Sequence, residues 1–81
     1  MRAPLTSFES HVREIVQATR ARDDVKVRTL CRTIAKLAAL KEHPSIERAA
    51  NHLAQQVTRF PASSRERVDA LLALTFEVTQ V

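Results

Sequence analysis

The chain has 81 residues, of which 44% are hydrophobic, and a formal net charge of +4. This length predicts one domain, residues 1–81, with a modest core. Glycine, tryptophan and tyrosine are absent and there is one cysteine, which argues against glycine-rich phosphate loops, aromatic platforms for single-stranded nucleic acid and an internal disulfide.

Apolar residues recur at helical spacing in four segments, which predicts helices at about 7–22, 24–42, 45–60 and 64–80. Asp23-Asp24 separates the first two and can cap the second. His43-Pro44-Ser45 breaks the pattern again, and Pro61 ends the third segment. Ser63 and Glu66 form a capping-box pattern before the fourth. We therefore predict an all-α fold, a compact antiparallel four-helix bundle of two helical hairpins with short loops and no β-structure.

The second predicted helix carries most of the positive charge. Residues 25–41 contain five basic residues and no acidic one, and residues 1–41 contain nine basic and four acidic residues. Arg28, Arg32 and Lys36 repeat every four residues opposite the apolar side, where like charges weaken an isolated helix slightly. Together with the first helix, this pattern predicts a basic partner-binding face formed by Arg13, Arg20, Arg22, Lys26, Arg28, Arg32 and Lys36.

The fourth predicted helix is apolar over most of its circumference. Its narrow polar stripe consists of Asp69, Ala73, Glu77 and Gln80. Such a helix is ordinarily buried against two neighbours in a bundle. The alternative is self-association of two chains through Leu74, Phe76 and Val81.

Residues that could carry chemistry do not form a recognisable motif. His11, Cys31, His43 and His52 lack the spacing of metal ligands, so we expect no metal and no cofactor. Cys31 falls on the apolar side of its helix, which is typical of a small buried side chain and not of a nucleophile. We therefore expect that the chain is not an enzyme.

A helix-turn-helix at the second and third helices is also disfavoured. The connecting turn lacks the frequent glycine, and the positive charge lies on the first of the two helices, not on the one that would read bases.

These observations favour a small helical binding protein, such as an adaptor, an inhibitor or a chaperone-like accessory factor. We expect it to dock through its basic face on an acidic surface of another protein. Nucleic-acid binding through the same face, a homodimer through the fourth helix, and a basic face that is merely solvated remain open alternatives. The sequence shows neither a membrane span nor the apolar core of a secretory signal, so we expect no membrane partner and a cytoplasmic location.

Overall fold

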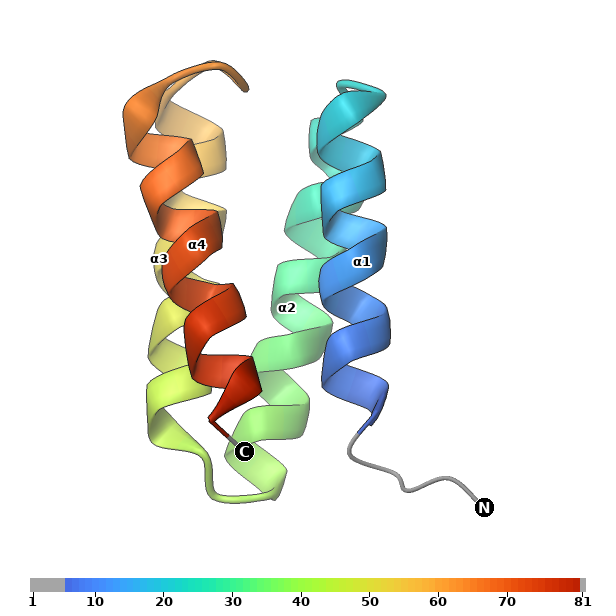
Figure 1. Ribbon diagram of the computed structural model, residues 1–81, viewed down its shortest axis with the longest axis vertical. Coiled ribbons are helices and arrows are strands. Elements are labelled where there is room, and N and C mark those ends of the chain that lie inside the picture. Colours follow the sequence, from blue (N-terminus) through green and yellow to red (C-terminus); the bar gives the residue numbers. More distant parts are fainter. Residues whose placement is uncertain (1–5, 81) are drawn as a thin grey trace.

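The computed structural model describes residues 6–80, which fold into four helices that run alternately up and down (Figure 1). These are α1 (Thr6–Arg20), α2 (Asp24–Leu40), α3 (Pro44–Arg59) and α4 (Arg65–Thr79). No strand occurs within residues 6–80. The prediction of an all-α, antiparallel four-helix bundle is therefore confirmed.

The helices lie around a square in chain order. Among neighbouring helices, packing is most extensive between α2 and α3. It is smaller between α3 and α4 and between α1 and α2, and it is least extensive between α1 and α4. The diagonal pairs, α1 with α3 and α2 with α4, make no close backbone contact. Each helix directs one apolar stripe into the centre, and the largest fully buried side chains there are Phe8, Ile15, Val27, Cys31, Ile34, Ile46 and Leu74.

The first two turns close in the same way, without glycine. After α1, the Asp23 N–H donates to the carbonyl of Ala18 at 2.9 Å, and after α2, the His43 N–H donates to that of Ala38 at 2.8 Å. These are Schellman closures, in which the preceding residue adopts a left-handed conformation. Arg22 and Glu42 occupy those positions, with φ of 60° and 61°. Both helices therefore end two residues before the predicted limits of 22 and 42.

The starts of α2, α3 and α4 differ in their caps. An Asp23 carboxylate oxygen accepts from the Lys26 N–H at 3.2 Å. The His43 side chain makes no capping bond, and Pro44 begins α3 at an N-terminal position that needs no N–H. The Ser64 hydroxyl accepts from the N–H of Arg67 at 3.3 Å, so the cap of α4 lies one residue after the predicted Ser63.

Among residues 6–80, no helix combines the length and the hydrophobicity needed to cross a bilayer.

Candidate functional site

The cationic row of α2 lies along the edge that meets α3. Arg32 and Lys36 line an open groove of about 270 Å³ between these helices, together with Ala35, Ala39, Glu47 and Asn51. Arg28 lies one turn before Arg32 on the same edge, because residues four apart share a face of a helix. Arg32 and Lys36 are exposed, whereas Arg28 is half-buried. None of these three cations forms an ion pair with the described residues 6–80. The alanines keep the floor of this α2–α3 groove open beside them.

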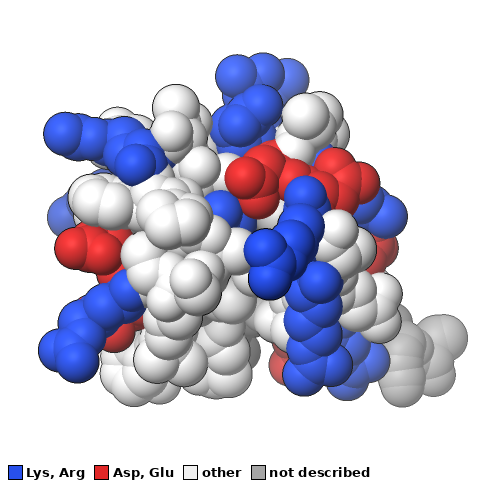
Figure 2. All heavy atoms as spheres, turned by 90° about the horizontal axis from the view of Figure 1, so that it is seen from above, with Lys and Arg blue, Asp and Glu red and all other residues white. Residues whose placement is uncertain are grey.

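The seven basic residues predicted as one face are distributed over several surfaces. Arg13 and Arg20 are exposed on α1, and Arg22 is exposed in the turn after it. Lys26 precedes Arg28 by two positions, which places it roughly 200° around α2. The row of α2 borders α3, so the width of α2 separates it from α1. Viewed from the end of the bundle that carries the α1–α2 turn, Lys and Arg side chains project in several directions with uncharged surface between them (Figure 2). Of the seven residues, Arg32 and Lys36 line the α2–α3 groove, whereas the others lie outside it; that these residues bind a partner stays a prediction.

The exposed apolar surface of α4 also differs from the predicted one. Leu74 is fully buried, so it belongs to the core and is removed from the self-association candidates. Phe76 is 60% exposed, and Leu72 and Val68 on the preceding turns are 62% and 47% exposed. Val81, the third predicted residue, lies outside the described residues. Val68, Leu72 and Phe76, spaced four residues apart, form an apolar row on α4.

The thiol of Cys31 is unsuited to nucleophilic chemistry. Cys31 is fully buried in the core. Burial raises the pKa of the thiol to about 12, although the nearby Arg67 guanidinium opposes that change. A thiol with such a pKa carries almost no thiolate at neutral pH. Within residues 6–80, no group of three or more His, Cys, Asp or Glu side chains is arranged to hold a metal ion.

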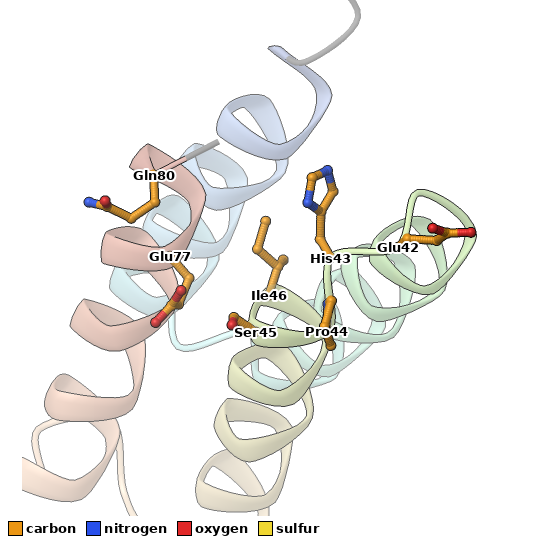
Figure 3. Close-up of a pocket in the computed structure, with 7 residues that line it drawn as sticks. All are labelled: Glu42, His43, Pro44, Ser45, Ile46, Glu77 and Gln80. Atoms are coloured by element: carbon orange, nitrogen blue, oxygen red, sulfur yellow. The ribbon is translucent and has the colours of Figure 1, made fainter.

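A pocket of about 250 Å³ lies where the α2–α3 turn meets the end of α4 (Figure 3). The Glu77 side chain points toward Ser45 in the first turn of α3, where the helix dipole favours a carboxylate. Glu42 and Gln80 point away from that centre on opposite sides. The His43 ring packs edge-on against Phe8 with their centroids 5.9 Å apart. Glu77 therefore already supplies the negative charge that an anionic ligand would bring to this pocket.

No protein-family model, no curated protein and no solved structure matches this chain. Its geometry and chemistry therefore carry the functional argument.

Sequence reasoning missed the most unusual polar residue, Arg67. It lies in the first turn of α4 and is buried, and its Nη1 lies 3.2 Å from Oδ1 of Asp24 on α2. The sequence does contain a pattern that indicates its burial. Arg67 is in helical register with three apolar residues on one side of the helix, namely Ala70, Leu74 and Val78. An arginine in register with a buried apolar row indicates either a long side chain reaching out to water or a buried cation with a partner.

Proposed function

We propose that this chain is a non-enzymatic protein-binding module that docks through the α2–α3 groove on an acidic helical segment of another protein. The observation that carries the proposal is that Arg32 and Lys36 line a groove with an alanine floor, with Arg28 one turn before them on the same edge of α2. Small floor residues let another backbone approach, and the cations supply charge complementarity along one wall.

The spacing of the row suits a helical partner. From Arg28 to Lys36 the helix rises by about 12 Å, so the cations repeat every 6 Å or so. Carboxylates placed four residues apart on a second helix repeat at the same interval. Glu47, on the opposite wall of the groove, would face a basic residue of such a segment. A uniform polyanion would instead bring negative charge against Glu47, which favours a protein partner over nucleic acid.

Charge-matched variants test this proposal. The first replaces the row: Arg28→Glu, Arg32→Glu and Lys36→Glu. The control makes the same charge change at exposed sites outside the groove: Arg13→Glu, Arg48→Glu and Arg59→Glu. Circular dichroism and urea unfolding establish that both variants retain the helical fold.

Binding is measured by fluorescence polarisation with three labelled probes. These are a helical peptide with glutamates at every fourth position, a peptide of the same composition in scrambled order, and a short DNA duplex. We expect the wild type to prefer the ordered peptide, the groove variant to lose about tenfold or more in affinity, and the control to lose much less. Equal losses in both variants would mean that only net charge matters, and would reject the proposal. Preferential DNA binding with a steep salt dependence would replace it with nucleic-acid binding.

A second candidate function, homodimerisation through α4, is favoured by the exposed row of Val68, Leu72 and Phe76. Exposed apolar side chains grouped on one helix are typical of interaction surfaces. Sedimentation equilibrium of the wild type and of Leu72→Glu tests it, since this site is exposed and the change should leave the core intact. A concentration-dependent dimer that Leu72→Glu abolishes would support self-association. A monomeric wild type throughout would remove that candidate without affecting the groove.

A further inference from the structure

The first turn of α4 places a positive charge inside the protein. Arg67 is 3% exposed and is the one charged residue buried within residues 6–80. Its Nη1 donates to the carbonyl of Phe60 at 3.4 Å and lies 3.2 Å from Oδ1 of Asp24. Its Nη2 is buried as well, yet it meets no hydrogen-bond acceptor among the described residues. A buried donor on a charged group is costly to leave unsatisfied, so this nitrogen requires an acceptor.

Arg67 also lines a small cavity. It measures about 30 Å³ and lies between α1, α3, α4 and the loop that precedes α4, and it is lined by Thr19, Leu53, Ala62, Arg67, Val68 and Leu71. Apart from Arg67, Thr19 is the one lining residue with a polar side chain. The walls are thus apolar except where a guanidinium and a hydroxyl can meet a ligand.

A wider surface hollow lies beside the cavity. It measures about 280 Å³ and shares Thr19 and Ala62 with the small cavity, so the two adjoin. Its remaining lining residues are Arg20, Arg22, Pro61 and Ser63. Two exposed arginines at this mouth attract anions toward the buried one. Figure 2 looks onto this end of the bundle, where Lys and Arg side chains are spread around the outline, with Asp and Glu side chains and uncharged surface between them.

We propose that this cavity and its mouth bind a carboxylate group, with one carboxylate oxygen accepting from Nη2 of Arg67 and the Thr19 hydroxyl as a second donor. Hydrogen bonds from a guanidinium to a carboxylate are charge-assisted and strong. The cavity admits a group about the size of one water molecule, so it takes a single ligand oxygen while the rest of the carboxylate lies in the wider mouth. The neighbouring Asp24 carboxylate opposes a dianion more than a monoanion.

Two sources could supply this carboxylate: a small free carboxylic acid, or the C-terminus of a peptide that enters through the mouth. The chemistry at Arg67 is the same in both cases. The α2–α3 groove lies elsewhere on the bundle, so this site does not depend on the function proposed above.

NMR titration of the full chain with labelled arginine side chains tests the site. Sodium acetate is titrated against sodium chloride at constant ionic strength, while the Arg67 side-chain resonances are followed. We expect saturable shifts with acetate at a weak, millimolar midpoint, because a ligand of four non-hydrogen atoms makes few contacts. A short alanine peptide with a free C-terminus, compared with its amidated form, shows whether a peptide end is preferred over acetate.

Three variants locate the site. Thr19→Val preserves the shape of the side chain but removes the hydroxyl, and should weaken acetate binding about 3–10-fold. In Arg67→Lys, where the backbone amides of Thr19 and Ala62 are followed because the Arg67 signals are gone, acetate should no longer cause saturable shifts. Arg13→Gln, at an exposed position on α1, should leave the response of the same amides unchanged. If Arg67→Lys does not fold, the Thr19 variant and the Arg67 resonances of the wild type still test the site. Equal responses to acetate and chloride, a response that never saturates, or full binding by Thr19→Val would overturn the proposal.

Discussion

Removing one or the other partner of the Arg67–Asp24 ion pair should affect stability unequally. Asp24→Asn leaves the guanidinium of Arg67, only 3% exposed, without its counter-charge. Breaking a fully buried pair in this way costs about 3–5 kcal/mol. The Asp24 side chain is 45% exposed, so water screens part of the interaction and we expect a loss of about 1–3 kcal/mol.

Arg67→Met should cost less, although it removes the larger side chain. Methionine fills much of the same unbranched volume and needs no hydrogen-bond partner. Asp24 then remains at the first position of α2, where the helix dipole favours a carboxylate. Replacing a buried charge by a well-packed apolar side chain is often neutral or stabilising, and we expect a change within about 1 kcal/mol in either direction.

Urea unfolding followed by far-ultraviolet circular dichroism measures both effects at pH 7. The double variant supplies the control, because Asp24→Asn should cost little once Arg67 is methionine. A larger loss of stability in Arg67→Met than in Asp24→Asn, or an equal cost of Asp24→Asn in both backgrounds, would show that the Arg67 charge does not depend on Asp24.

Three further predictions concern the core, the turns and the thiol. Leu74→Ala should lose about 2–5 kcal/mol of unfolding free energy because Leu74 is fully buried, whereas Leu72→Ala, at an exposed site, should change it by about 0.5 kcal/mol or less. Urea unfolding measures both variants, and similar losses would contradict the assignment of the buried and exposed faces of α4. Glu42→Gly should stabilise the protein by about 0.5–1 kcal/mol, since glycine adopts the left-handed conformation at φ 61° without steric cost. The matched control, Glu66→Gly in the first turn of α4, should destabilise the protein by about 1 kcal/mol. A loss of stability in Glu42→Gly would contradict the geometry of this turn. Cys31 should resist thiol reagents in the folded state. Because burial raises the pKa of its thiol from 9.0 to about 12, the contribution of the buried, protonated thiol to stability should be complete below pH 9 and should fall by about 1 kcal/mol per pH unit from there to pH 12. The difference in stability between the wild type and Cys31→Ala should therefore shrink as the pH rises from 8, and a constant difference would contradict this.

The helices are predictable from the sequence because each break is marked by local chemistry. Asp23 caps α2, Pro44 begins α3, and Pro61 follows α3. These signals act within a few residues, so no tertiary information is needed to read them. The predicted ends of α1 and α2 fall two residues late because glycine normally marks a Schellman closure. Here Arg22 and Glu42 adopt that conformation, and nothing in their side chains indicates it.

The candidate site is less predictable, because it depends on which helix lies beside which edge. The spacing of Arg28, Arg32 and Lys36 places them on one line, but only the packing of α2 against α3 shows that the line borders a groove. On α4 the apolar arc is too wide for the sequence to identify the inward side, which is why the prediction includes Leu74 as a candidate for self-association although it is buried. The inward side of α4 is identified by Arg67, since this arginine reaches Asp24 only if its own side of α4 faces α2.

The Arg67–Asp24 pair also connects the two helical hairpins at one end of the bundle. The α2 and α4 helices lie on a diagonal and make no close backbone contact, so only a long side chain can connect their first turns. Arg67 does so while also donating to the carbonyl of Phe60 at the end of α3. A leucine at this position would fill the core but could not reach Asp24. At the opposite end of the bundle, the ring contact between Phe8 and His43 joins α1 to the α2–α3 turn. Beyond its apolar core, the bundle therefore has an aromatic contact at one end and an incompletely satisfied arginine at the other, and this arginine leaves a donor for a ligand.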